Sequence, residues 1–360
     1  MGTGRSKAGG KAQSTSRKAA RAPQREAKGE ACTALVLQGG AGLGAYEAGV
    51  LQALLEQQRR LDVVTGCSIG ALMAAIVVGS RGDPIEALRD MWRRFAMPVN
   101  PFLPGRFARS LPLLGGRNVY RANPMYFALP GLATHIYEAA PLEAALKEWV
   151  DFDKLNAAPT EVIVTAVDLR SGHLVEFSSH RHKLAPRHVL ASTSLPPVFP
   201  PTRVDGSDYW DGGLISSTPL RPAINAIERH NRRKRAAHWE LIVVDLLTAA
   251  DGPPQDMTDV LQRAFELVFF GKFQHDLKLF QWMNDQLDLM IEVDRALPAN
   301  SAVRSHPAYM RLKRHRRVDR LTIVRTRDPA ALGRPADFSD ESIARRIKLG
   351  YAEALAALRP

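Results

Sequence analysis

The sequence predicts an α/β protein with a mostly parallel central sheet, because two units of strand, loop and helix follow one another near its start. Residues 33–37 form a short apolar run with β-branched members, typical of a buried strand, and they lead into the glycine-rich segment 38–44. A helix with an apolar face is expected next, and residues 63–65 and 69–78 repeat the order of strand, tight turn and helix. This alternation is how a parallel α/β sheet begins.

The rest of the chain continues the sheet and then changes to helix. Four further apolar runs have the length and composition of strands: 162–166, 174–177, 241–246 and 321–325. Helical spacing of apolar residues predicts helices over 260–284 and 339–358, and Ser339 or Asp340 can cap the second one. Residues 98–131 are rich in proline and glycine, so we expect an irregular excursion there that forms a lid or a substrate-facing loop.

Charge and composition divide the chain into three parts. Residues 1–30 hold eight basic and two acidic residues, and their charge of +6 is half of the formal net charge of +12. Because apolar residues are scarce there, we expect a disordered basic tail. The main α/β domain is expected over 31–250, with a mainly helical extension over 251–360 packed on it. The tail is either a solvated segment or one that anionic lipid headgroups attract.

The composition excludes several classes of protein. Only Cys32 and Cys67 are present among 360 residues, so neither a disulfide framework nor a metal-ligand cluster is expected, and a reducing compartment is favoured. No apolar run approaches the roughly 20 residues of a membrane span, and the N-terminus lacks the apolar core of a secretory signal. We therefore expect cytoplasmic residence. No nucleic-acid partner is expected, because nothing beside the basic tail supports the recognition of bases.

A five-residue turn, Gly66-Cys67-Ser68-Ile69-Gly70, is the first candidate for chemistry. It fits the pattern Gly-x-Ser-x-Gly and lies between an expected strand and an expected helix. Its two glycines permit a strained, close-packed turn that exposes the hydroxyl of Ser68 above the helix N-terminus. This context indicates a serine nucleophile. The alternative is an ordinary turn in which Ser68 only caps the helix.

The glycine-rich segment 38–44 is expected at the same end of the sheet as Ser68, because it follows the neighbouring strand. Small residues there leave backbone N–H groups exposed, as an oxyanion requires. The alternative is a dinucleotide-binding fingerprint, since residues 40–45 supply Gly-x-Gly-x-x-Ala. That fingerprint needs an acidic residue at the end of the next strand, whereas Asp62 precedes that strand, so no cofactor is expected.

A serine nucleophile needs a base, and Asp211 is the strongest candidate. The sequence Tyr-Trp-Asp-Gly-Gly at 209–213 places this carboxylate in a glycine turn after apolar residues, where loss of water would raise its pKa. The alternative is an Asp-Gly-Gly turn at the surface. His180, His182 and His188 lie among Arg and Lys residues, and we expect a solvated basic segment there, not part of a triad.

Four blocks, taken together and in this order, resemble the patatin-like phospholipase family. They are the glycine loop and helix start at 39–51, the elbow at 66–70, the run 191–201 and Asp211-Gly212-Gly213. The similarity extends over roughly residues 33–222 and implies a three-layer α/β/α fold. The run 337–351 is similar to a bacterial branch of the family, which has an additional, mainly helical C-terminal region.

The resemblance implies roles for individual residues. Ser68 becomes the nucleophile and Asp211 its base, in a dyad without a catalytic histidine. The small residues with implied roles are Gly39, Gly40, Ala41 and Gly42 as oxyanion donors, and Gly66 and Gly70 at the elbow. Many members have Arg or Lys at the position of Leu43 and Thr at that of Cys67. We expect Cys67 to be buried beside Ser68 and unreactive.

The resemblance also implies a class of substrate. It predicts a serine lipid acyl hydrolase, a phospholipase A-type esterase, that needs neither a cofactor nor a metal. Soluble esters, thioesters or a stored polyester are alternative substrates, and a non-catalytic lipid-binding protein on the same fold is the alternative function. The expected partners are the lipid or ester substrate and an anionic membrane surface, which the tail at 1–30 would contact peripherally.

Overall fold

The computed structural model describes residues 31–97, 119–129, 131–233, 238–246, 253–254 and 256–358. The expected basic tail at 1–30 lies outside these residues, and so do 98–118 and 130 of the stretch rich in proline and glycine. Within the described part of the chain, no helix is both long enough and apolar enough to cross a lipid bilayer.

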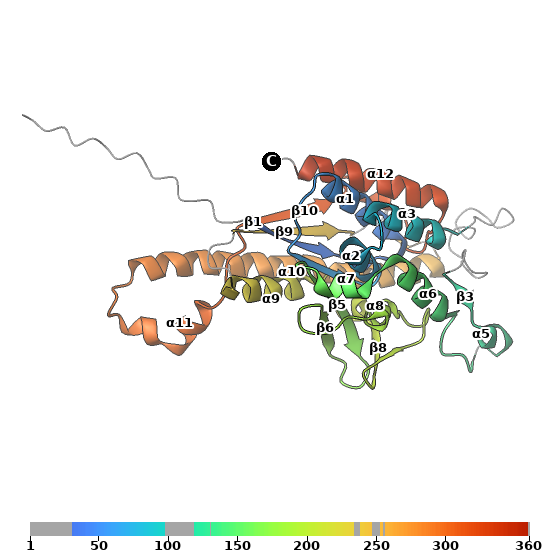
Figure 1. The fold of residues 1–360 in the computed structure, drawn as a ribbon, viewed down its shortest axis with the longest axis horizontal. Coiled ribbons are helices and arrows are strands. Elements are labelled where there is room, and N and C mark those ends of the chain that lie inside the picture. Colours follow the sequence, from blue (N-terminus) through green and yellow to red (C-terminus); the bar gives the residue numbers. More distant parts are fainter. Residues whose placement is uncertain are drawn as a thin grey trace, which may run out of the picture.

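The described residues form a central sheet of eight strands (Figure 1). Five strands run parallel, in the spatial order β10 (Arg320–Arg325), β9 (His238–Asp245), β1 (Ala31–Leu37), β2 (Val63–Cys67) and β5 (Glu161–Asp168). Three strands with antiparallel pairings complete the sheet: β6 (Leu174–Ser178) and β8 (Ser207–Asp211) pair with β5, and β7 (Thr202–Val204) pairs with β8. The mostly parallel sheet is confirmed, and each apolar run that predicted a strand forms one.

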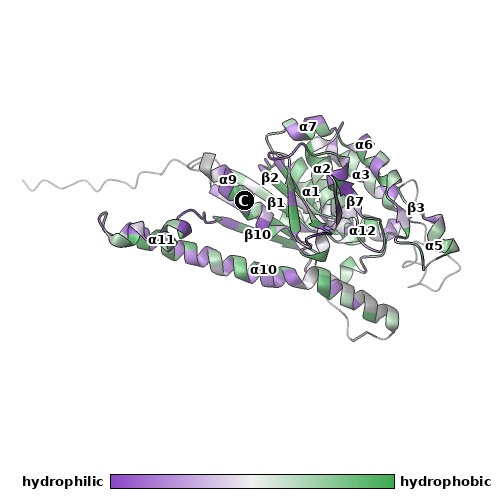
Figure 2. Cartoon of the chain, turned by 90° about the horizontal axis from the view of Figure 1, so that it is seen from below, coloured by the Kyte–Doolittle hydropathy of each residue, from purple (hydrophilic) through white to green (hydrophobic). Residues whose placement is uncertain are grey.

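Helices cover both faces of the sheet, so the predicted three layers are confirmed. One helical layer contains α1 (Gly44–Glu56), α2 (Ile69–Gly79), α3 (Pro84–Phe95) and α12 (Asp340–Ala357), and the other contains α9 (Leu220–Arg233) and α10 (Met257–Ala296). Successive side chains of a strand point to opposite faces. Leu35 and Leu37 of β1 therefore join the first core, whereas Ala34 and Val36 join the second. Figure 2 shows α10 along one side of the molecule, with hydrophobic and hydrophilic residues interspersed.

The C-terminal part of the chain is built into the same sheet and core. β10 pairs with β9, and α12 crosses α1 at two glycines. A Cβ atom on Gly49 would lie 2.0 Å from the carbonyl oxygen of Ile347, and one on Gly350 would lie 2.0 Å from that of Tyr46. The two helices thus meet backbone to backbone, which no larger residue allows. Residues on both sides of the expected boundary at 250 share one sheet.

Several elements were not predicted from the sequence. Besides β7 and β8, the short ones are β3 (Arg121–Ala122), α5 (Pro124–Ala128), β4 (Tyr137–Glu138), α6 (Ala140–Trp149), α7 (Phe152–Ala157), α8 (Pro186–Thr193) and α11 (Pro307–Leu312). Four 3-10 turns lie at Ala41–Leu43, Gly212–Leu214, Ala302–Ser305 and Pro329–Leu332. The long helix α10 extends beyond the predicted 260–284 at both ends. Ser339 caps α12, since its side chain accepts the N–H of Ser342.

Candidate active site

Ser68 occupies a strained turn between β2 and α2. Its backbone has φ 53° and ψ −124°, in the region that favours glycine, and its N–H donates to Oγ of Ser192 at 3.0 Å. Ser68 occupies the N-cap position of α2, but its side chain makes no capping hydrogen bond to the helix. Such a conformation costs about 1 to 3 kcal/mol and persists only where surrounding contacts impose it.

The glycines on either side of Ser68 are required by close packing. A Cβ atom on Gly66 would lie 2.3 Å from the carbonyl oxygen of Gly70, which folds back over the strand end. A Cβ atom on Gly70 would lie 2.8 Å from the carbonyl oxygen of Leu37, at the end of β1. Only glycine fits at either position, and the turn therefore brings Ser68 against the loop that follows β1.

Asp211 reaches Ser68 because of the register of the sheet. β6 pairs with residues 163–167 of β5, a stretch that overlaps the residues paired with β2 and those paired with β8. Because each strand has two edges, β2 and β8 must share the edge of β5 opposite to β6. Cys67 lies opposite Thr165, and Asp211 lies opposite the next residue, Ala166. β8 therefore pairs with β5 just beyond the end of β2, and its last residue, Asp211, lies beside the Ser68 turn.

The Asp211 carboxylate is buried and has few partners. The residue is 1% exposed, and its Oδ1 accepts the N–H of Gly213 at 2.8 Å and lies 3.5 Å from Sγ of Cys67. Burial raises the pKa of Asp211 to about 6, although hydrogen bonds from the Ser68 hydroxyl, the Gly213 N–H and the Cys67 thiol lower it. The interpretation of residues 211–213 as a surface turn is wrong.

Cys67 is completely buried, as expected. Burial, reinforced by the nearby charge of Asp211, raises the pKa of its thiol well above the usual range. Because the thiolate is the reactive form of cysteine, Cys67 is an inert neighbour of the site.

The glycine loop lies against Ser68, but two of its four expected donors are already used. A Cβ atom on Gly39 would lie 3.0 Å from Cβ of Ser68. The N–H of Gly39 donates to the Ser217 carbonyl at 2.8 Å, and that of Gly42 donates to the Pro335 carbonyl at 2.9 Å. The expectation that all four N–H groups are available is therefore wrong for Gly39 and Gly42. Among the described residues, no backbone acceptor outside the local helical turn is recorded for Gly40 or Ala41.

The C-terminal part of the chain holds this loop through Arg346 of α12. The guanidinium is completely buried and donates to four carbonyl oxygens: Leu332 at 2.7 Å, Asp337 at 2.6 Å, Arg334 at 2.8 Å and Gly42 at 3.1 Å. Burial lowers the pKa of Arg346 to about 10, which leaves it charged at neutral pH. A cation therefore lies directly behind the glycine loop, where Leu43 itself is buried and uncharged.

Two buried polar residues support the loop from its other side. The N–H of Gln38 donates to Oε1 of Glu47 at 2.6 Å, and the Gln38 Oε1 accepts the N–H of Leu246 at 2.8 Å. Burial raises the pKa of Glu47 well above its usual range, although the hydrogen bond from the Gln38 N–H lowers it. Glu47 lay within the motif that resembles the family, but the motif alone gave it no role.

The run 191–201 contacts both candidate catalytic residues. Ser192 accepts the N–H of Ser68, and the carbonyl oxygen of Ser194 accepts the N–H of Asp211 at 3.0 Å. The Ser194 hydroxyl is itself bonded to Oγ1 of Thr202 at 2.7 Å. The resemblance drew attention to this run without a role for it, and the structure shows that it fixes the backbone at both residues.

No histidine is recorded among the contacts of Ser68 or Asp211 in the described residues. His180 and His182 are exposed, but the expectation of a solvated segment is wrong for His188, which is buried. The Nδ1 atom of His188 accepts the N–H of Ala185 at 3.0 Å, and burial lowers its pKa. This ring supports the start of α8.

A sequence model of the family described as patatin-like phospholipase matches residues 35–224, just over half of the chain. The chain belongs to this family. The patatin-like segment includes Ser68, Asp211 and the glycine loop. Pro335 and Arg346, which hold the loop, lie outside it.

Curated relatives are similar to this patatin-like chain over only part of their length. The lysophospholipase NTE1 of Cryptococcus neoformans is 26% identical over 249 residues, which cover 66% of this chain but 12% of that protein. An uncharacterized NTE family protein of Mycobacterium bovis is 26% identical over 189 residues, 52% of this chain and 44% of that protein. Among solved structures, VipD from Legionella pneumophila is 16% identical and covers 91% of this chain and 66% of its own, with a TM-score of 0.39.

Proposed function

We propose that this chain is a lipid acyl hydrolase of phospholipase A type, with Ser68 as nucleophile and Asp211 as base. One observation carries the proposal: a strained, partly exposed serine and a buried carboxylate meet at one end of the sheet, where burial raises the pKa of Asp211 to about 6 and the Ser68 hydroxyl lowers it. Such a carboxylate is mostly ionised at pH 7 and still basic enough to take a proton during the attack. The chemistry needs no histidine.

The first step acylates Ser68. Its Oγ bonds to the ester carbonyl carbon while the hydroxyl proton moves to Asp211, and the carbonyl oxygen becomes an oxyanion. The bond to the leaving alcohol oxygen then breaks, and Asp211 returns the proton to that oxygen. In the second step, water attacks the acyl carbon and gives a proton to Asp211. The bond to Oγ breaks, the carboxylic acid leaves, and Ser68 regains the proton.

The oxyanion would be stabilised by the N–H groups of Gly40 and Ala41. Donors that are fixed before the reaction stabilise developing charge without reorganisation. The structure supports such fixation, because Gly39 and Gly42 on either side are held by Ser217, Pro335 and Arg346. The charge of Arg346 has the sign that favours an oxyanion. It could replace the Arg or Lys that many family members have at the position of Leu43.

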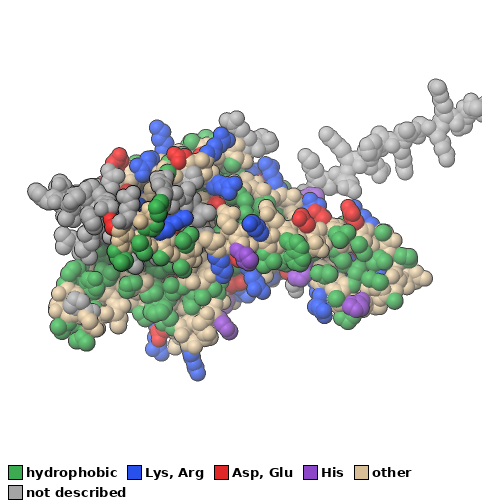
Figure 3. Space-filling model, turned by 180° about the vertical axis from the view of Figure 1, so that it is seen from behind, with side chains coloured by type: hydrophobic (Ala, Val, Ile, Leu, Met, Phe, Trp, Pro, Cys, Tyr) green, Lys and Arg blue, Asp and Glu red, His purple; other side chains and the backbone are tan. Residues whose placement is uncertain are grey.

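An exposed apolar surface supports a lipid substrate. Helix α5 and the turn after it expose Met125 (48%), Phe127 (51%), Leu129 (52%) and Leu132 (73%). Figure 3 shows hydrophobic side chains gathered at the end of the molecule that carries α5. This surface is attached to the run 191–201, since the N–H groups of Ile136 and Tyr137 donate to the carbonyls of Pro197 and Val198. Exposed apolar side chains beside a hydrolytic site suit a lipid interface.

Labelling with a fluorophosphonate probe tests the proposal. We expect the full chain to be labelled at Ser68 and to hydrolyse a p-nitrophenyl ester, and the variant Ser68→Ala to lose both properties while it remains folded. Ser207→Ala provides a matched control, because this serine lies at the far end of β8 from Asp211. Retained turnover in Ser68→Ala would exclude the serine mechanism.

Mass spectrometry of products from phosphatidylcholine and phosphatidylglycerol vesicles tests the class of substrate. Release of a fatty acid and a lysophospholipid supports phospholipase A activity. Turnover of soluble esters alone would favour the alternative of a soluble or polymeric ester. Vesicle binding without labelling or products would indicate a non-catalytic lipid-binding protein.

A further inference from the structure

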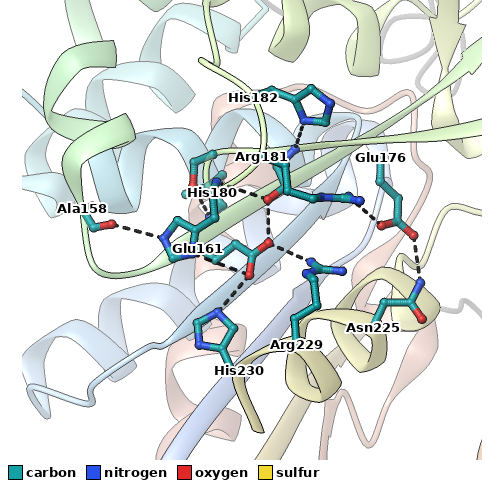
Figure 4. A network of polar contacts seen from close by, with 12 residues as sticks. Ala158, Glu161, Glu176, His180, Arg181, His182, Asn225, Arg229 and His230 are labelled. Atoms are coloured by element: carbon teal, nitrogen blue, oxygen red, sulfur yellow. Dashed lines mark hydrogen bonds and ion pairs between the residues drawn. The ribbon is translucent and has the colours of Figure 1, made fainter. Parts of the chain in front are cut away.

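A second cluster of ionisable side chains lies at the other end of β5 (Figure 4). Glu161 begins the strand and is 1% exposed. Its Oε2 lies 2.9 Å from Nε2 of His230, on α9, and 3.8 Å from Nδ1 of His180, in the loop between β6 and α8. The two imidazole rings stack with centroids 5.7 Å apart. Three separate segments thus bring a carboxylate and two imidazoles together.

The two carboxylate oxygens of Glu161 have different partners. Oε2 faces the two imidazoles, whereas Oε1 is bonded to other side chains. Oε1 of Glu161 accepts from the Ser178 hydroxyl at 2.5 Å and from Nη2 of Arg229 at 2.8 Å. In Figure 4, Arg229 approaches the carboxylate from the side opposite to the imidazoles. Nε2 of His180 lies 3.4 Å from the carbonyl oxygen of Ala158, so a proton on Nε2 leaves the lone pair on Nδ1.

We propose that Glu161, His180 and His230 bind a divalent cation of the zinc class, with water as a fourth ligand. Two imidazole nitrogens and one carboxylate oxygen suit Zn²⁺, whereas Mg²⁺ and Ca²⁺ require mainly oxygen ligands. The three ligand atoms already lie within 4.8 Å of one another. In a tetrahedral site with bonds of about 2.1 Å they would be about 3.4 Å apart, so small side-chain movements suffice.

The surroundings match what a zinc site requires beyond its ligands. Ligand imidazoles usually donate their second N–H to a carbonyl, as His180 can to Ala158, and ligand carboxylates are themselves hydrogen-bonded, as Glu161 is to Ser178. The side chains of His180 and His230 are 24% and 18% exposed, which gives an ion and a water access.

The bound ion would act on the fold and not on the ester. Glu161 precedes Thr165 by four residues, or about 13 Å of strand, and Thr165 lies opposite Cys67 in the register. The ion would join the start of β5, helix α9 and the loop before α8. Because the ion would bind the folded chain, it would raise stability by mass action.

Calorimetric titration of the full, chelator-treated protein with Zn²⁺ tests the site. We expect one Zn²⁺ per chain and an affinity at least about tenfold weaker in both His180→Ala and His230→Ala. His182→Ala is the matched control, because it lies in the same loop but its Nδ1 accepts the Ser178 N–H, and we expect unchanged affinity. Co²⁺ should give the strong visible absorption of a tetrahedral site in the wild type and not in His180→Ala.

Two outcomes of the titration would contradict the proposed zinc site. Unchanged affinity in either ligand variant would show that zinc binds elsewhere, and no stoichiometric binding by the wild type would leave only an ion-pair network. His180→Ala keeps the test valid if His230→Ala does not fold, since His180 lies on an exposed loop. The readout is independent of ester hydrolysis, so it stands whether or not Ser68 is catalytic.

Discussion

The two ends of β5 each hold a carboxylate that is almost completely buried, and the two respond in opposite ways. Asp211 lies beside the C-terminal half of the strand and Glu161 at its start, and each is 1% exposed. The pKa of Asp211 is raised to about 6, whereas that of Glu161 is lowered to about 2. Equal exposure to solvent therefore does not determine protonation. The depth of burial and the partners of the carboxylate do.

The partners differ in charge. Asp211 receives hydrogen bonds from a hydroxyl, a thiol and one backbone N–H, all neutral, which do not replace the lost hydration of its charge. Glu161 receives them from Arg229, His230 and Ser178, and the cation compensates for burial. Burial among neutral partners thus raises the pKa of Asp211 near one end of the strand, whereas Arg229, His230 and Ser178 keep Glu161 ionised at the other.

The largest expected effect is on catalysis at the Asp211 end. Asp211→Asn keeps the shape of the side chain but cannot accept a proton, so we expect kcat for a p-nitrophenyl ester to fall about 10³-fold or more. Asp208→Asn, on the exposed face of the same strand, is the control and should keep full activity. A loss of less than tenfold in Asp211→Asn would remove Asp211 from the role of base.

The next largest effect is on the free energy of unfolding. A neutral substitution of Glu161 should lower it, whereas a neutral substitution of Asp211 should raise it. Glu161→Gln leaves the Arg229 cation without its counter-charge, so we expect the free energy of unfolding to fall by about 3 kcal/mol at pH 8. Asp211 has its pKa raised from 3.8 to about 6, so the stability linked to its protonation is complete below pH 3.8 and is lost as pH rises through 6. At pH 8, Asp211→Asn should therefore gain up to about 3 kcal/mol.

Urea unfolding at pH 8 measures both variants. Destabilisation by both substitutions would contradict the comparison, because it would mean that Asp211 is as well compensated as Glu161. A gain for Asp211→Asn together with its loss of activity would show that the candidate site is maintained at a cost in stability.

A third test concerns the buried cation at the Ser68 end. Arg346→Lys keeps the charge but cannot reach four carbonyl oxygens at once, so the glycine loop should lose its fixed position. We expect kcat to fall about tenfold to 100-fold with a smaller change in KM, because fixed donors act on the transition state. Arg345→Lys, its exposed neighbour, should have no effect. Equal effects in the two variants would show that the contacts of Arg346 with the glycine loop do not support catalysis.

The smallest expected effect that distinguishes Asp211 from Glu161 is on the pH dependence of activity. Asp211 must be ionised to act as base, so kcat/KM should fall tenfold per pH unit below about pH 6 and level off above it. Glu161, ionised down to about pH 2, should leave no mark on this profile. If kcat/KM fell only near the ordinary pKa of an aspartate, burial would not raise the pKa of the catalytic base.

The sequence predicted those parts of the molecule that depend on local patterns. The parts of β1 and β9 that are buried on both faces, residues 34–37 and 241–244, are continuous apolar runs. Helix α2 is apolar throughout because it packs between the sheet and other helices. The hairpin of β7 and β8 was missed, although Asp205-Gly206 is a strong two-residue turn signal and both residues have positive φ. Its flanking strands are short and partly polar, which weakens the alternation.

Only those residues of the candidate site that belong to short sequence motifs could be predicted. Ser68 and Asp211 stand in short glycine patterns, but the acceptors that occupy the Gly39 and Gly42 N–H groups come from residues 217 and 335. Likewise, Glu161, His180 and His230 are spread over 69 residues and show no metal-ligand spacing. Contacts between distant segments depend on sheet register and helix packing, which a single sequence does not display.

The attachment of Gly42 to Arg346 has a consequence for synthesis. A ribosome adds about 5 to 20 residues per second, so the 304 residues between these two positions take about 15 to 60 seconds to make. During that time the nascent chain already carries Ser68, and later Asp211, while the glycine loop still lacks the guanidinium and the Pro335 carbonyl that hold it. On the proposed mechanism, the oxyanion donors would therefore take up their fixed positions only after α12 has been made.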